Sequence, residues 1–254
     1  MSSTTVAFAS VPPGAFQRRL ADGQLQTVHI TKTVQWQTTP FSVGLYQAYR
    51  DALGITADPE LEIWDDVWKP GPLFSDANVH GNDVPVVGVS YNDALGAVAW
   101  LSRRDGRAYR LPTEAEFEYA VRAKCSCTAA CDFSSVPHRK HTGRAWPEAF
   151  LSCWNASAKT ANPHGIHGLN GVLWHWCSDW YAPYPDAPDT TDPHGPETEP
   201  TSTLWKGRTL PAGRVIRGGS YSYPEWYGRC DNRHFSFSDD RNVNLGFRVV
   251  FDAA

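Results

Sequence analysis

Proline and glycine interrupt this chain so often that few segments keep the spacing of an amphipathic helix. The 254 residues include 19 Pro and 20 Gly, and both residue types favour turns. They also include 11 Trp, whose large apolar surface is usually ordered for packing or recognition. We therefore expect an α+β protein with short helices, many turns and an aromatic core.

Three segments carry helical signals. In residues 42–53, apolar side chains recur at helical spacing. Residues 93–104 follow Asn92, which is the expected N-cap. A third helix is expected after Thr113, because Glu116 three residues later completes a capping box. The inward face of the second helix is predicted to consist of Leu95, Val98, Trp100 and Leu101.

Strand signals occur on both sides of the helices. The expected strands lie within residues 6–34, 173–181, 214–216 and 246–251. The first of these stretches contains a hairpin-type turn at Asp22-Gly23. Residues 182–213 are rich in Pro, Asp and Thr without periodicity, so a long surface loop is predicted there. With no internal repeat and no long linker, residues 1–254 are expected to form a single domain.

Charge and hydropathy argue against several classes of partner. The formal net charge is -4, so no general attraction to nucleic acid or to an anionic membrane is expected. No stretch approaches the ~20 apolar residues that span a bilayer. The N-terminal residues lack a basic start followed by an apolar run, so no secretory signal is predicted. A cytoplasmic location is therefore expected, and a role on a surface or a phage particle is left open.

Five segments follow one another in an order typical of a known family. They are residues 84–94 (VPVVGVSYNDA), 110–120 (RLPTEAEFEYA), 171–181 (GVLWHWCSDWY), 214–221 (RVIRGGSY) and 244–248 (NLGFR). Through them the chain resembles the formylglycine-generating-enzyme (sulfatase-modifying factor) superfamily over nearly its whole length. The resemblance implies a C-type-lectin-like α+β fold with two to three helices, twisted antiparallel strands and much irregular loop.

The same resemblance implies a copper site, which this sequence lacks. Oxidases of the family bind copper through two cysteines a few residues after the Gly-Gly-Ser motif, and soft thiolates suit Cu(I). The matching positions here are Tyr223 and Gly228, and Cys230 stands alone nearby. The sequence therefore predicts no formylglycine chemistry, no catalytic residues and no cofactor.

Other metal sites are also disfavoured. At a calcium site of the family, the oxygen ligands are replaced here by Val172 and His175. His164 and His167 lie close to His175 in sequence, but we expect ordinary hydrogen-bonded histidines. Four cysteines are crowded enough to suggest a metal or redox clip, but their spacing is not that of a zinc knuckle, and we expect ordinary free or buried thiols. These are Cys125, Cys127, Cys131 and Cys153.

The C-terminal window, residues 221–244, is rich in Tyr, Ser, Asn, Asp, His and Phe, the side chains of adaptable binding surfaces. It resembles the variable window of diversity-generating retroelement proteins. There, adenine mutagenesis of AAC-type codons creates many residues but never Trp, Glu, Gln, Lys or Met. Only Glu225 and Trp226 fall outside the reachable set, so both are expected to be fixed. Arg229, Arg233 and Arg241 are expected to donate structural hydrogen bonds to loop carbonyls.

The sequence thus predicts a non-catalytic protein that binds varied ligands, most readily proteins, through this window. The expected contact residues are Ser222, Tyr223, Trp226, Tyr227, Asp231, Asn232, His234, Phe235, Ser236 and Phe237. Trp226 would be a fixed anchor, whereas Phe235 and Phe237 also fit inward-facing positions of a strand. The alternative is a divergent metal-dependent oxidase or oxygenase of the family, built around Cys230 or the histidines. The sequence leaves the ligand and the oligomeric state open.

Overall fold

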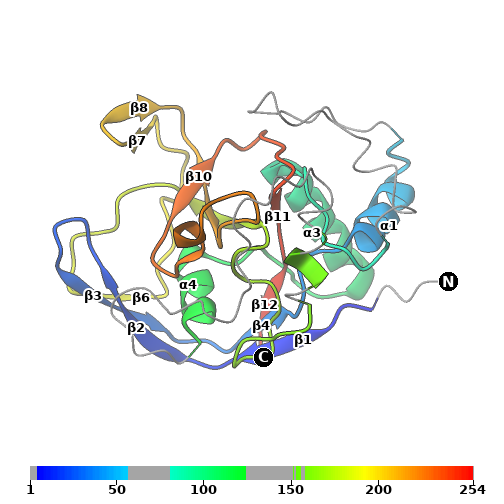
Figure 1. Ribbon diagram of the computed structural model, residues 1–254, viewed down its shortest axis with the longest axis horizontal. Helices are drawn as coiled ribbons and strands as arrows, with labels where there is room; N and C mark the ends of the chain where they lie inside the picture. Colours follow the sequence, from blue (N-terminus) through cyan, green and yellow to red (C-terminus); the bar gives the residue numbers. More distant parts are fainter. Residues whose placement is uncertain (1–4, 57–80, 124–150, 152, 156–157, 254) are drawn as a thin grey trace.

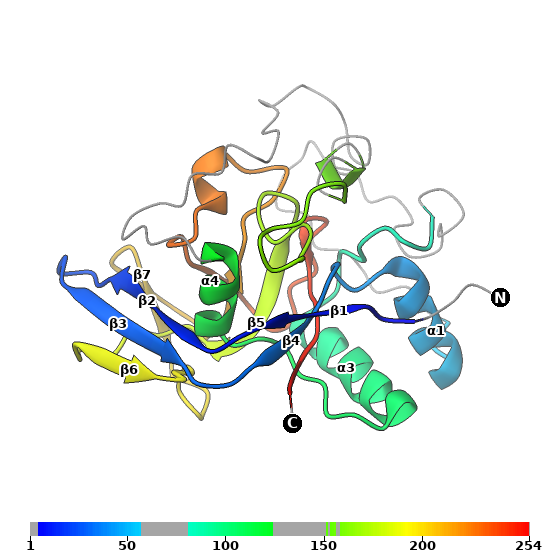
Figure 2. The ribbon, with the colours of Figure 1, turned by 90° about the horizontal axis from the view of Figure 1, so that it is seen from below.

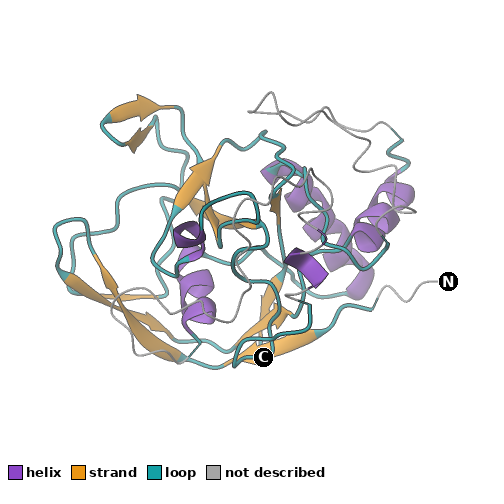
Figure 3. Ribbon diagram, in the orientation of Figure 1, coloured by secondary structure: helices purple, strands orange, loops and turns teal. Residues whose placement is uncertain are grey.

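Short strands and long loops make up most of this protein, and helices α1 and α3 lie together on one side of it (Figures 1 and 3). The structure is a computed structural model that describes residues 5–56, 81–123, 151, 153–155 and 158–253. Figure 3 shows how loops and turns connect the elements, and every strand is short, with at most the 7 residues of Trp174–Trp180. The predicted α+β class with much irregular loop is confirmed.

Two helices begin where the sequence places them. Helix α1, Val43–Leu53, is capped by Ser42, whose side chain accepts a backbone hydrogen bond. Helix α4, Glu114–Arg122, starts with the predicted capping box between Thr113 and Glu116. Among the described residues, no helix combines the length and the apolar character needed to cross a bilayer.

Helix α3, Tyr91–Asp105, starts earlier than predicted. Its cap is Ser90 and not Asn92, because the Ser90 hydroxyl and the Asp93 carboxylate each accept a hydrogen bond from the other's backbone N–H. Leu95 is 41% exposed, so its predicted inward position is wrong. The buried residues of α3 are Tyr91, Ala94, Ala97, Val98 and Leu101.

A four-stranded sheet forms the centre of the molecule, in the order β10-β9-β5-β11. Its strands are β5 Trp174–Trp180, β9 Arg214–Arg217, β10 His234–Ser236 and β11 Leu245–Gly246. The pairs β10–β9 and β9–β5 are antiparallel, whereas β11 runs parallel to β5. Helix α4 packs against β5 and β9 (Figure 2). The segments that carry the family resemblance therefore meet at this sheet.

Smaller sheets lie around this centre. They comprise β1 Phe8–Val11 and β12 Val250–Asp252 on either side of β4 Val34–Gln37, β2 Gly14–Arg19 with β3 Leu25–Ile30 and β6 Asp189–Thr191, and β7 Thr203–Trp205 with β8 Arg208–Leu210. The predicted hairpin is the β2–β3 pair. The expectation of a strandless loop over residues 182–213 is wrong, because β6, β7 and β8 lie within it.

Buried charges link α4 to the central sheet. The guanidinium of Arg217 lies 3.4 Å from the carboxylate of Glu114 and 3.1 Å from that of Glu118. Arg122 pairs with Glu118 at 2.7 Å, and Arg233 pairs with Glu114 at 2.6 Å. All but Arg233 are almost fully enclosed. Each charge is compensated only as long as its partners stay in place.

We predict that Arg217→Met strongly destabilises the protein. The change leaves Glu114 and Glu118 with one cation each and removes a hydrogen bond to the Cys230 carbonyl. Breaking a buried ion pair costs about 3–5 kcal/mol, measurable by urea denaturation. The matched control is Arg229→Met, which removes an exposed pair with Asp231 and costs at most about 1 kcal/mol. Equal losses in the two variants would contradict the role of the buried network.

Candidate functional site

Two glycines, Gly218 and Gly219, lie directly before the window, residues 221–244, and form the base on which it packs. Gly218 and Gly219 have φ values of 101° and 65°, which favour glycine. A Cβ added to Gly219 would lie 2.7 Å from the backbone nitrogen of Gly228, closer than any side chain tolerates. The chain then forms the 3-10 turn η1, Glu225–Gly228, before it reaches β10. The Gly-Gly pair therefore lets η1 pack directly on the end of β9.

An aromatic cluster lies on this base and consists of Trp174, Tyr223, Trp226, Tyr227 and His234. The buried Trp174 ring contacts the rings of Tyr223, Tyr227 and His234 at centroid distances of 5.7, 6.0 and 5.6 Å. Tyr227 also packs edge-on against Tyr223 at 4.9 Å and stacks on Trp226 at 3.8 Å. Tyr223 and Trp226 are 42% and 54% exposed. The cluster thus has a buried root and an exposed aromatic surface.

Polar side chains fix the backbone around the cluster. Asn232 donates a hydrogen bond to the Tyr227 carbonyl at 2.7 Å. The Ser222 hydroxyl lies 3.0 Å from that of Ser220 and accepts a hydrogen bond from Asn244 at 2.8 Å. These contacts tie both ends of the window together, so the aromatic surface has an ordered support.

The predicted contact residues separate into three groups by exposure. Tyr223, Trp226 and Asp231 are exposed. Ser222, Tyr227, Asn232, His234 and Phe237 are half-buried. Phe235 and Ser236 are buried, which corrects their predicted placement on the contact surface. The Phe235 ring packs against Tyr181 at 5.2 Å, and the Ser236 hydroxyl donates to the Asp240 carboxylate at 2.5 Å.

The arginines of the window bind carboxylates as well as the predicted carbonyls. Arg233 makes two hydrogen bonds to Glu114, at 2.6 and 2.8 Å, and one to a backbone carbonyl. Arg241 makes two hydrogen bonds to Asp93 of α3, at 2.9 and 3.1 Å. Arg229 pairs with a neighbouring carboxylate at the surface. Two of the three arginines therefore anchor the window to helices.

The residues at the family's copper positions do not fit copper. Tyr223 offers a phenol in the exposed aromatic surface, and Gly228 has no side chain. Cys230 is buried at the base of the window. Tyr223 and Gly228 therefore supply no thiolate, which is the ligand that Cu(I) prefers. Three crowded cysteines, namely Cys125, Cys127 and Cys131, lie outside the described residues, and Cys153 donates to a backbone carbonyl at 3.3 Å.

The two residues that stand at the family's calcium positions, Val172 and His175, are both buried. Val172 is fully buried among apolar residues. The guanidinium of Arg248 lies 3.2 Å from Nε2 of His175 and donates to the carbonyls of Gln37 and His167. Burial and the Arg248 charge hold the pKa of His175 well below its ordinary value. Within the described residues, no group of three His, Cys, Asp or Glu side chains is placed to hold a metal.

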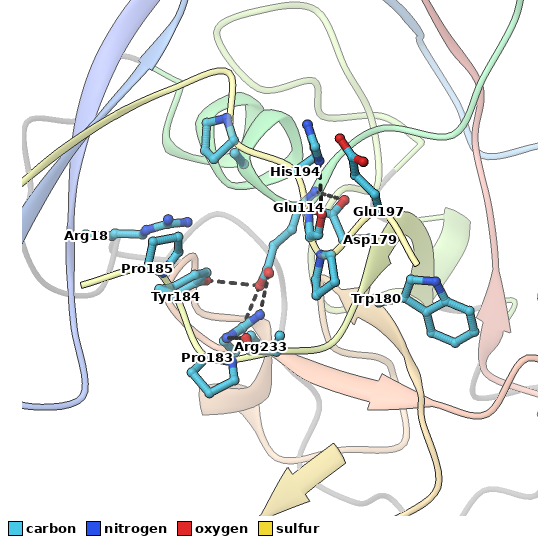
Figure 4. A pocket seen from close by; sticks show the side chains of 15 residues that line it. Arg18, Glu114, Asp179, Trp180, Pro183, Tyr184, Pro185, His194, Glu197 and Arg233 are labelled. Carbon is cyan, nitrogen blue, oxygen red and sulfur yellow. Dashed lines mark hydrogen bonds and ion pairs between the residues drawn. The ribbon is translucent and has the colours of Figure 1, made fainter. Parts of the chain in front are cut away.

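A pocket of about 360 Å³ lies beside the N-terminus of α4 (Figure 4). The buried carboxylate of Asp179 lines it and accepts hydrogen bonds from the backbone N–H groups of Glu114 and Gly195, at 2.8 and 2.7 Å. Burial, with a further contribution from Glu114, raises the pKa of Asp179 to about 6. The sequence did not indicate this pocket, because its residues come from segments far apart in the chain.

A loop-built surface carried on a central sheet defines a C-type-lectin-like fold of the formylglycine-generating-enzyme type. The chain belongs to the family of the sulfatase-modifying factor enzyme 1-like domain, whose model matches residues 2–253.

The proteins that resemble this chain in sequence include enzymes, whereas those that resemble it in structure include a variable protein. A formylglycine-generating enzyme of Streptomyces coelicolor is 36% identical over 66% of this chain and 53% of its own length. The chain spans about half the length of the curated relatives it matches first. Treponema denticola variable protein 1 has a TM-score of 0.68 at 17% identity, over 99% of this chain and 97% of its own. PvdO from Pseudomonas aeruginosa has a TM-score of 0.66 at 22% identity, over 97% and 94%. At these sequence identities, both structural similarities show a shared fold and nothing about function.

We predict that Asp179 makes the folded state less stable as the pH rises. Its pKa is about 6 in the folded protein against 3.8 ordinarily, so the stabilising protonated form is present below pH 3.8 and is lost through pH 6. The free energy of unfolding of the wild type, relative to Asp179→Asn, should fall by about 3 kcal/mol between these limits. Urea denaturation at a series of pH values measures it. Glu197→Gln, at an exposed carboxylate of the same pocket, should leave the profile unchanged, and a flat difference for Asp179→Asn would refute the assignment.

Proposed function

We propose that this protein is a non-catalytic ligand-binding protein, a single domain whose binding surface is the window. The observation that carries the proposal is the replacement of the family's copper ligands. Tyr223 stands where the first thiolate would be, and it forms part of the exposed aromatic cluster. At the position where an oxidase of the family would bind copper, this protein therefore has the exposed ring of Tyr223, which can contact a ligand.

The aromatic cluster has the properties of a binding anchor. Tyr223 and Trp226 combine exposure with contacts to the half-buried Tyr227, so few degrees of freedom are lost when a partner binds. Large aromatic side chains with restricted rotamers dominate the energetics of many protein interfaces. This supports a protein as the ligand. The half-buried Ser222, Asn232 and the exposed Asp231 surround the cluster as adaptable polar contacts.

The proposal includes diversification of the window by a retroelement. Its support is compositional, because Glu225 and Trp226 alone lie outside the set of residues that adenine mutagenesis can create. The exposed positions are those at which substitution costs little stability. Trp226 is the fixed anchor, and the reachable residues around it vary.

A divergent oxidase or oxygenase is the second candidate. The identity of 36% to the Streptomyces enzyme favours it. Such an enzyme would have to build its metal site from Cys230 or from the histidines, since Tyr223 and Gly228 do not provide thiolates.

Sequencing the DNA that flanks the gene tests the diversified binding function. We expect a near-copy of the codons for residues 214–248, beside a reverse-transcriptase gene. The copy should differ from the gene only where it carries adenines, and the differing codons would identify the variable residues one by one. A flanking region with neither feature would refute diversification.

Copper binding distinguishes the two candidates. We predict that the wild type does not bind stoichiometric Cu(I) through Cys230 in competition with a chromogenic chelator. The variant Tyr223→Cys/Gly228→Cys should gain one Cu(I), because a Cβ at Gly228 has no neighbour closer than 3.6 Å. Copper bound by the wild type and lost in Cys230→Ser would favour the oxidase. Copper unaffected by Cys230→Ser would belong to other thiols.

A further inference from the structure

The pocket beside α4 has the size and walls of a small-molecule site. Its volume of about 360 Å³ falls in the range of ~300–1,000 Å³ typical of such sites. Residues 182–185 and 193–197 form much of its wall and contribute four prolines and Tyr184. Trp180 adds a second aromatic ring. Figure 4 shows Tyr184 and Pro185 beside Arg18, whereas the Trp180 ring lies apart from them. The pocket shares only Arg233 with the window.

Arg18 brings a buried positive charge to this pocket. It lies on β2 and is only 3% exposed. Its Nε and Nη2 atoms both donate to the side-chain oxygen of Gln26, at 2.8 and 2.6 Å, and an amide carries no compensating charge. Within the described residues, Arg18 has no carboxylate partner and its Nη1 has no hydrogen bond. Nη1 is not one of the fully enclosed unpaired side-chain atoms, so it keeps a small accessible surface.

The other charges near Arg18 are already paired. Glu114 is bound to Arg217 and Arg233, which together hold its pKa below the ordinary value against the effect of burial. Its Oε1 also accepts a hydrogen bond from Tyr184 at 3.0 Å. The Tyr184 ring in turn contacts two guanidinium groups, those of Arg18 at 3.5 Å and Arg233 at 4.0 Å. None of the residues that the structure describes therefore supplies an anion to Arg18.

The carboxylates that line the pocket are poorly placed to supply that anion. The oxygens of Asp179 are occupied by the backbone N–H groups at the start of α4 and of the 193–197 segment. Glu197 is exposed, as is His194, which lies next to the carbonyl of Gly195. A buried cation without a partner is costly, and an incoming anion would offset that cost.

We propose that this pocket binds a small organic carboxylate with an apolar body. The carboxylate accepts hydrogen bonds from the guanidinium of Arg18, whose planar donors match its geometry. The apolar body packs against the prolines, Tyr184 and Trp180. This site is independent of the proposed function of the window.

Isothermal titration calorimetry with benzoate, at constant ionic strength, tests the proposal. We expect saturable binding of benzoate and none of benzamide, which has the same shape without the charge. Arg18→Met should weaken binding by about tenfold or more, since charge-assisted hydrogen bonds are lost. The matched control is Arg19→Met, which removes the same charge from the exposed face of β2 and should leave the affinity unchanged.

Two further variants keep the test decisive if Arg18→Met does not fold. Glu197→Gln removes a like charge from the pocket and should tighten benzoate binding. Arg18→Lys keeps the charge without the planar donors and should weaken it. Equal binding of benzoate and benzamide, no binding of either, or an unchanged affinity in the folded Arg18 variants would overturn the proposal. Binding of sulfate in place of benzoate would overturn the carboxylate assignment.

Discussion

The buried charge network around Glu114 is the interaction on which the rest of the molecule depends. Glu114 begins α4, its partner Arg217 ends β9, and its partner Arg233 belongs to the window. One carboxylate therefore fixes a helix, the central sheet and the window relative to one another. Since removing a single member would leave buried charges uncompensated, the network favours one arrangement of these three elements.

In this arrangement, the residues that hold the window in place are distinct from the residues that the window exposes to solvent. Trp174 on β5 and the glycine pair after β9 form the support, and both are enclosed or sterically constrained. Tyr223 and Trp226 project from it and are substantially exposed. Substitutions at the exposed positions leave the network and the glycine contacts intact, so we infer that the surface can change while the fold persists.

Local sequence signals predicted much of the fold but not its long-range pairings. The capping box at Thr113 was recognisable because both partners lie within four residues. Ser90 and Asn92 are both good capping residues, and only the reach of Asp93 back to Ser90 decides between them. Strand β6 escaped notice because three residues show no periodicity and its partner β3 lies about 160 residues away in the chain. Alternation alone also left the inward direction of Phe235 undecided. The pocket was missed because Arg18, Glu114 and Asp179 meet only in the folded protein.

The proposed binding function would require few alterations of an oxidase of this family. A pair of catalytic thiolates must be accessible to the substrate and must be held rigidly. A residue that contacts a partner protein must likewise be accessible and rigidly held. Tyr223 satisfies both, because it is exposed and its ring packs on Trp174 and Tyr227. Meanwhile Gly218, Gly219 and Arg248 keep their structural contacts, which depend on backbone geometry and buried carbonyls. The motifs that mark the family thus lie mainly in this support, whereas the residues used by the proposed binding function lie in the window.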